Sequence, residues 1–413
     1  MITNLPTQFS IQDYLLVDVA IRIQLNPTNY QKAVQRYEAI NSYLDRPDSP
    51  LTGLIELFYP QGSMAIGSTI ASSLTNDHFD LDTIAQLRID PYTEPMQVLD
   101  HLFQALNGSP GSRYHGKVKR NSRCVTVVYE DGMRIDVTPM VRRVATPERE
   151  SILFHHRHET PREPGYRKVA NPYGFAVWFN KRTPPEATFG EQYAALAKDY
   201  TLLAEAEQEP IPDQEHPREK SMAAIALQLI KRYRNVKFDQ RDFRRPPSVL
   251  LAKWVADAAG VGHPQLIDEL LHQARNMHQI VSGHIATGCL VHVVNPECPA
   301  DSLTDRWPAS QDDQKLFVAD LDHFIQQLQH LRAGCPIEEM RQILSDLFGE
   351  RPSVDAVKGL SENYGKYVQR GGNYVSGRQA PSGSAALVGL SGVSPTHARP
   401  TPKHTFFGEE NDA

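Results

Sequence analysis

The feature that most constrains this chain is a pair of β-prone segments that carry acidic residues. In the segment 79–85, polar and apolar residues alternate, which is typical of a half-buried strand. Side chains two residues apart on a strand point the same way, so we expect Asp80 and Asp82 to share one face. Further on, Asp131-Gly132 separates two β-prone runs and indicates a hairpin. Asp136 lies on the second arm of this hairpin.

Three carboxylates on one surface repel each other, and a cation relieves that repulsion. Mg²⁺ prefers oxygen ligands and typically takes one or two carboxylates together with substrate phosphates. We therefore expect Asp80, Asp82 and Asp136 to bind two Mg²⁺ ions, which Mn²⁺ could replace. Two ions about 3.5–4 Å apart bind the attacking and leaving oxygens of an in-line displacement. Asp136 would lie nearest the attacking hydroxyl and could accept its proton.

A glycine-serine turn precedes the acidic strand. Gly62 allows the backbone to approach a phosphate closely, and Ser63 adds a hydroxyl and an amide as donors. The residues 64–70 can open a helix, whose N-terminus favours anions. An isolated Asp-x-Asp pair or Gly-Ser turn is most often a solvated edge or turn. Their combination with a downstream hairpin aspartate predicts a site for two metal ions and a triphosphate.

At these residues the chain resembles the cGAS/DncV-like nucleotidyltransferases, within the polymerase-β-like superfamily that includes oligoadenylate synthases. The similarity spans about residues 10–365, and the matching segments are 61–63, 79–82, 134–139, 171–174 with 178–179, and 294–296 with 305–307. The resemblance implies an α+β fold. Its first part is a polymerase-β-like core, a mixed sheet with helices. A C-terminal α-helical lobe follows, with the active site in the cleft between them.

The resemblance also implies an activity. It predicts a Mg²⁺-dependent enzyme that condenses nucleoside triphosphates, ATP with GTP as a second candidate, into a cyclic di- or trinucleotide and releases pyrophosphate. In bacterial members such a messenger activates a downstream effector in anti-phage signalling. Two alternatives stay open: nucleotide transfer to a protein, an antibiotic or an RNA end, and a catalytically silent nucleotide-binding scaffold.

Two residues of the helical part are implicated by the resemblance alone. Family members hold the donor triphosphate with a Lys on one helix and a Ser that opens the next. Lys231 and Ser248 match these positions. Each also has an ordinary interpretation, because Lys231 could be a solvated cation at a helix C-terminus and Ser248 a plain N-cap.

Three regions follow from the pattern along the chain. Residues 1–190 would form the nucleotidyltransferase lobe with an N-terminal spine helix that braces both lobes, 191–369 the helical lobe, and 370–413 a flexible tail rich in Gly, Ser and Pro. Helical apolar spacing predicts helices at 31–44, 191–207, 220–234, 248–258, 265–282, 312–333 and 337–348.

The segment 145–170 is rich in Arg, His, Glu and Pro, and we expect an irregular surface segment there. His155, His156 and His158 lie within it. Because no acidic or Cys companion stands at suitable spacing, we expect an exposed loop and not a metal site.

The tail ends in an aromatic pair, Phe406-Phe407, which is typical of a docking peptide. Some bacterial relatives are joined through their C-terminus to other molecules by a ubiquitin-activating-like partner. By that resemblance, Ala413 would be the acceptor terminus.

Composition excludes several classes of protein. The net charge of −6 argues against constitutive DNA binding, which usually needs a basic domain. The chain has no apolar run long enough for a membrane span and no signal-peptide pattern. Its four cysteines are scattered, without zinc-finger spacing, which fits the reducing bacterial cytoplasm.

Overall fold

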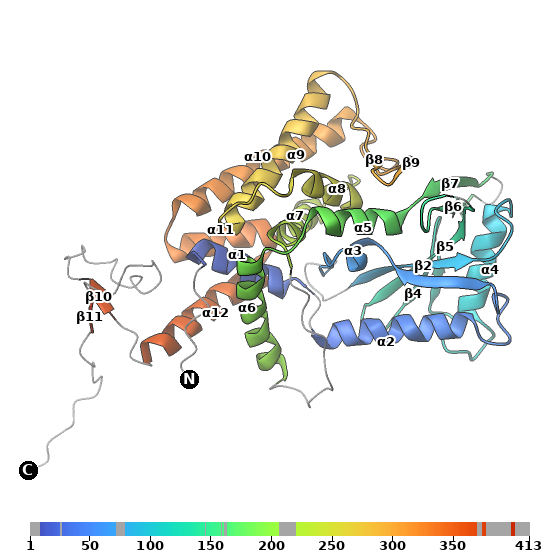
Figure 1. Cartoon of the computed structure of the whole chain (residues 1–413), viewed down its shortest axis with the longest axis horizontal. Coiled ribbons are helices and arrows are strands. Elements are labelled where there is room, and N and C mark those ends of the chain that lie inside the picture. The colour runs from blue at the N-terminus through green and yellow to red at the C-terminus, as the bar shows by residue number, and fades with distance from the viewer. Residues whose placement is uncertain are drawn as a thin grey trace, which may run out of the picture.

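A computed structural model describes residues 9–24, 27–71, 79–144, 146–157, 159–160, 163–205, 220–369, 374–376 and 398–400. Two parts lie side by side (Figure 1). We call residues 27–170 the sheet lobe, and helix α1 together with residues 171–369 the helical lobe.

The sheet lobe is built on a seven-stranded mixed sheet with the path β1-β2-β5-β4-β3, extended from β5 by β6 and β7. The strands are β1 (Ile55–Pro60), β2 (Asp80–Leu87), β3 (Val118–Arg120), β4 (Val125–Val128), β5 (Arg134–Arg142), β6 (Ser151–His155) and β7 (Tyr166–Ala170). Strands β2 and β5 run parallel, whereas the other pairs are antiparallel. The predicted strand at 79–85 and the hairpin around Asp131-Gly132 are confirmed.

Helices cover the sheet because alternate residues of its strands are apolar. Leu81 on β2 and Ile135 on β5 are buried in a core that also contains residues of α2 (Pro27–Leu44) and α4 (Pro95–Asn107). Figure 1 shows α2 and α4 against the sheet. The buried apolar residues of α2, among them Ile40, belong to the core of the sheet lobe. We predicted that a helix at this place braces both lobes. The N-terminal helix whose residues belong to the core of the helical lobe is α1.

The helical lobe has its own apolar core. Its helices are α1 (Ile11–Arg22), α5 (Pro172–Arg182), α6 (Ala187–Glu205), α7 (Met222–Phe238), α8 (Ser248–Ala258), α9 (Leu266–Ala286), α10 (Gln311–Ala333), α11 (Ile337–Phe348) and α12 (Glu350–Gln369). A small hairpin of β8 (Val294–Asn295) and β9 (Cys298–Ser302) contacts β7 of the sheet lobe. Helix α1 packs against α7, α9 and α12, although it begins the chain.

The predicted α+β class, a mixed sheet with helices followed by a helical part, is confirmed. Two predicted helices, 248–258 and 337–348, have the observed bounds, and the other predicted helices are present with shifted ends. The division at residues 190 and 369 stays a prediction. Within the described residues, no helix combines the length and apolarity that crossing a membrane requires.

The expectation of an irregular segment at 145–170 is wrong. Residues of β6 pair antiparallel with both β5 and β7, and Ser151 and Phe154 are fully buried. In the tail, β10 (Tyr374–Ser376) pairs with β11 (Ala398–Pro400). The remaining tail, with Phe406-Phe407 and Ala413, lies outside the described residues.

Candidate active site

Parallel pairing of β2 and β5 brings the acidic residues together. The register places Asp82 opposite Asp136 and Asp80 opposite Arg134. Asp80, the first residue of β2, is exposed, whereas Asp82 and Asp136 are half-buried. All three line a cleft of about 1260 Å³ between the two lobes. A local strand pattern and one long-range strand pairing therefore assemble the carboxylates on one wall.

The acids carry negative charge that the protein compensates only in part. Burial, with the nearby carboxylates of Asp136 and Asp80, raises the pKa of Asp82 to about 7. Burial also raises the pKa of Asp136, although a hydrogen bond from the Thr126 hydroxyl opposes this effect. Asn121 Nδ2 in turn donates to Thr126 Oγ1 at 2.6 Å, which fixes that hydroxyl. A divalent cation would relieve this repulsion, so the donor set fits Mg²⁺.

The three carboxylates are not packed around one point. Within the described residues, they do not all place an oxygen within 4.8 Å of the others. Ligands of one Mg²⁺ at about 2.0–2.1 Å lie at most about 4.2 Å apart. Binding of one ion by all three carboxylates would therefore require a rearrangement of these side chains.

The glycine-serine turn lies directly against the acids. Gly62 has a φ of +59°, and a Cβ added there would lie 2.6 Å from Asp82 Oδ2. The backbone amide of Gln61 donates to the Asp82 carbonyl at 2.8 Å, which holds the turn against β2. Only one helical turn follows, α3 (Gly62–Ala65), and residues 66–71 are irregular, so the expected helix across 64–70 is wrong.

Lys231 reaches the segment that follows this turn from the other lobe. It lies in the middle of α7, is 4% exposed, and its Nζ donates to the Ser68 carbonyl at 2.6 Å. The interpretation as a solvated cation at a helix end is therefore wrong. Burial and the neighbouring Arg234 lower the pKa of Lys231 to about 7.

Ser248 lines the same cleft as Lys231. It is the first residue of α8, and Pro247 occupies the N-cap position, so Ser248 is not a plain cap. Its hydroxyl accepts a hydrogen bond from Arg234 Nη1 at 3.1 Å. Gly62 and Ser63 line the cleft as well. All the candidate residues that the structure describes therefore face one cavity, whereas Ala413 is outside the described residues.

Comparison with known proteins identifies the family of this chain. Residues 10–157 match the model of the Second Messenger Oligonucleotide or Dinucleotide Synthetase domain. The chain is 37% identical over 408 residues to the cyclic dinucleotide synthase CdnG of Bradyrhizobium diazoefficiens, covering 96% of this chain and 94% of that protein. It belongs to the CD-NTase family.

The fold of this CD-NTase agrees with that assignment. The solved structure of the same CdnG in complex with GTP matches with a TM-score of 0.73 and 35% identity, over 85% of this chain and 99% of that one. A c-di-GMP synthase of Roseivirga ehrenbergii is 25% identical over 359 residues, covering 84% of this chain and 86% of that protein. The predicted polymerase-β-like architecture is thereby confirmed, the chain is a nucleotidyltransferase, and family membership implies divalent metal use.

The structure adds residues that sequence reasoning missed. Arg123 Nη2 lies 2.7 Å from Asp305 Oδ2, and Lys168 Nζ lies 3.3 Å from the same oxygen and 3.1 Å from Asp301 Oδ1. These ion pairs join the sheet lobe to the β8–β9 region along the cleft. Asp305 stood within a segment of family resemblance, but nothing in the sequence indicated its partners.

His155 and His156 do not lie in an exposed loop, which corrects that expectation for these two residues. His155 ends β6, and its ring stacks on Tyr166 with 4.3 Å between ring centroids. His156 is 3% exposed, and its Nδ1 lies 3.1 Å from Arg120 Nη2. Both line the cleft, whereas His158 is outside the described residues. Burial and nearby Arg123 lower the pKa of His155 to about 4.

Proposed function

We propose that this CD-NTase condenses two nucleoside triphosphates into a cyclic dinucleotide, and that GTP is a substrate. One observation carries the activity: the three carboxylates, the glycine-serine turn, Lys231 and Ser248 all line one cleft. The choice of GTP is supported by the relatives, since one is a c-di-GMP synthase and another was solved with GTP. ATP, the substrate the sequence suggested first, is the competing candidate.

The reaction consists of two similar steps. A ribose hydroxyl of one nucleotide attacks the α-phosphorus of the other, the bond to the β-phosphate oxygen breaks, and pyrophosphate leaves. A second attack closes the ring. Two Mg²⁺ ions held by Asp80, Asp82 and Asp136 would neutralise triphosphate charge and lower the pKa of the attacking hydroxyl. Asp136 is the candidate acceptor of that proton, and the bond from Thr126 favours its ionised form.

The donor triphosphate would bind where the two lobes meet. At Gly62 the absence of a Cβ leaves space beside Asp82, and Ser63 offers its amide and hydroxyl. Lys231 supplies a cation in surroundings of low dielectric, where a charge interaction is stronger than in water. Arg234 holds Ser248, so its hydroxyl is positioned before nucleotide arrives.

We place the product in second-messenger signalling through a downstream effector, with anti-phage defence as the setting. The name of the matching domain supports the messenger role. The expected conjugation of Ala413 stays a prediction.

Labelled GTP and ATP, singly and mixed, should separate the possibilities. Incubation with Mg²⁺ followed by phosphatase should leave a protected product from GTP, whose mass identifies a cyclic dinucleotide. The double variant Asp80→Asn/Asp82→Asn should make none, whereas Asp312→Asn, an exposed acid in the first turn of α10, should behave as wild type. Only free nucleosides from the wild type, or linear and target-attached products, would contradict the proposal.

A further inference from the structure

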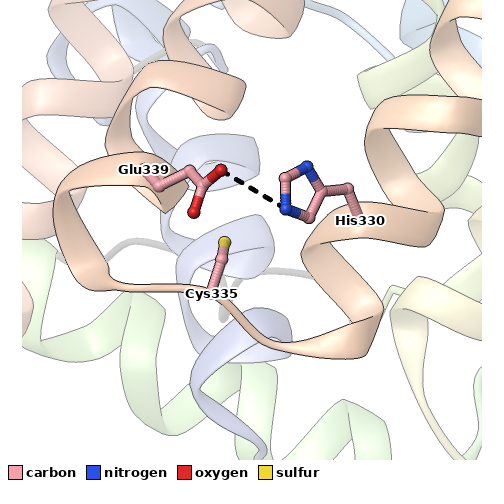
Figure 2. A group of neighbouring side chains, drawn as sticks. All are labelled: His330, Cys335 and Glu339. Carbon is pink, nitrogen blue, oxygen red and sulfur yellow. Dashed lines mark ion pairs between the residues drawn. The ribbon is translucent and has the colours of Figure 1, made fainter.

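A second group of metal-ligating side chains lies where α10 ends and α11 begins. His330 is in the last turn of α10, Cys335 in the connecting turn and Glu339 in the first turn of α11. Each places a donor atom within 4.8 Å of the other two, and no other trio of His, Cys, Asp and Glu in the described part of the chain does so. Figure 2 shows the three side chains turned toward one another. We propose that this trio binds Zn²⁺.

The spacing fits a tetrahedral ion. His330 Nε2 lies 3.3 Å from Glu339 Oε1. Nitrogen and oxygen ligands that bind one zinc at about 2.0–2.2 Å with tetrahedral angles lie about 3.4 Å apart. The imidazole and the carboxylate therefore already have the separation of two zinc ligands. Their side chains are 50% and 43% exposed, so a fourth position faces solvent and can take water.

The charge of the group also favours a cation. The positions of His330 near the end of α10 and Glu339 near the start of α11 suit the two helix dipoles, so their 3.3 Å contact does not itself require a metal. The thiol of Cys335 takes no part in that ion pair. It is half-buried, its pKa is raised by burial and by the Glu339 carboxylate, and it makes no hydrogen bond within the described residues. A dication would stabilise the thiolate and the carboxylate together.

The ligand set selects zinc over the metal of the active site. Thiolate and imidazole favour Zn²⁺, whereas Mg²⁺ requires oxygen ligands. The ion would fasten the end of α10 to the start of α11. Helix α11 is held to α7 by an ion pair of 3.1 Å between Lys237 and Asp346. The expected role is therefore stabilisation of the helical lobe, independent of the proposed reaction.

Cobalt is the probe that tests this assignment, because a thiolate bound to Co²⁺ gives a charge-transfer absorption that carboxylates do not. The full chain, stripped of metal by chelation, should develop this absorption with one equivalent of Co²⁺ and lose it on addition of Zn²⁺. Zn²⁺ should also raise the Tm. Cys335→Ser should abolish the absorption, and His330→Gln should weaken binding about tenfold or more.

The matched control is Cys124→Ser. Cys124 lines the active-site cleft near Asp136, so the two side chains could together bind Co²⁺ in competition with the proposed site. Cys124→Ser removes that thiol and should retain the absorption. Absence of the absorption in wild type, or its persistence in Cys335→Ser, would overturn the proposal. Asp82→Asn should abolish nucleotide synthesis and leave the absorption intact, so failure of the zinc site and failure of the proposed function are distinguishable.

Discussion

Replacing Gly62 by alanine should lower the rate about 100-fold and the free energy of unfolding by about 1–2 kcal/mol. The new Cβ would lie 2.6 Å from Asp82 Oδ2. Because the optimal separation of such atoms is about 3.5 Å, the carboxylate must move by roughly 1 Å. A displacement of that size can lower a rate by about 100-fold, which corresponds to about 2.7 kcal/mol of activation free energy.

Backbone strain is a separate effect and needs its own control. The φ of +59° at Gly62 costs an alanine about 1–2 kcal/mol. Gly53 is the matched control position, because its φ is also positive, at +69°, and a Cβ added there would meet nothing within 4 Å. Gly53→Ala should therefore lower the free energy of unfolding similarly and leave the rate unchanged.

Two measurements decide this prediction. Thermal unfolding should show a Tm lower by about 2–4 °C for each kcal/mol lost in either variant. The initial rate of pyrophosphate release at saturating nucleotide should fall only in Gly62→Ala. Equal rates in the two variants would refute the argument that the turn and Asp82 are in functional contact.

Three further changes have distinct expected outcomes. Burial and Arg234 hold the pKa of Lys231 at about 7, so its positive charge should strengthen binding of a non-hydrolysable triphosphate below pH 7 and less as the pH rises. Binding titrations at several pH values should show this pH dependence lost in Lys231→Met and kept in Lys237→Met. Thr126→Val removes a bond that opposes the raised pKa of Asp136, so the acidic limb of the rate profile should move to higher pH, whereas Thr126→Ser should restore it. Asp305→Asn breaks an ion pair across the cleft and should raise KM by at most about fivefold, because partly exposed pairs contribute about 1 kcal/mol or less.

Local patterns in the sequence predicted the features that depend on neighbours along the chain. Alternation predicted β2, Asp131-Gly132 predicted the hairpin of β4 and β5, and apolar spacing predicted α8 and α11 with their bounds. The acids and the turn were found because each lies on such an element. Family resemblance then added Lys231 and Ser248, which no local pattern distinguishes from ordinary helix ends.

Features that depend on distant partners could not be predicted. Strand β6 lies in a segment whose charged and proline-rich composition indicates a loop, and its pairing with β7 decides otherwise. The contact of Lys231 with Ser68 joins residues 163 positions apart. His330, Cys335 and Glu339 are close in sequence, but their spacing matches no familiar zinc pattern, and only the turn between α10 and α11 brings their donor atoms together.

The parallel alignment of Asp82 with Asp136 has a consequence for biosynthesis. A parallel pair cannot form from a simple hairpin, so the connecting residues must already be synthesised and folded before the two aspartates can meet. A nascent chain that ends before β5 would display Asp80 and Asp82 without their counterpart. We therefore expect nascent fragments that end before β5 to be inert toward nucleotides, because the third carboxylate is missing from them.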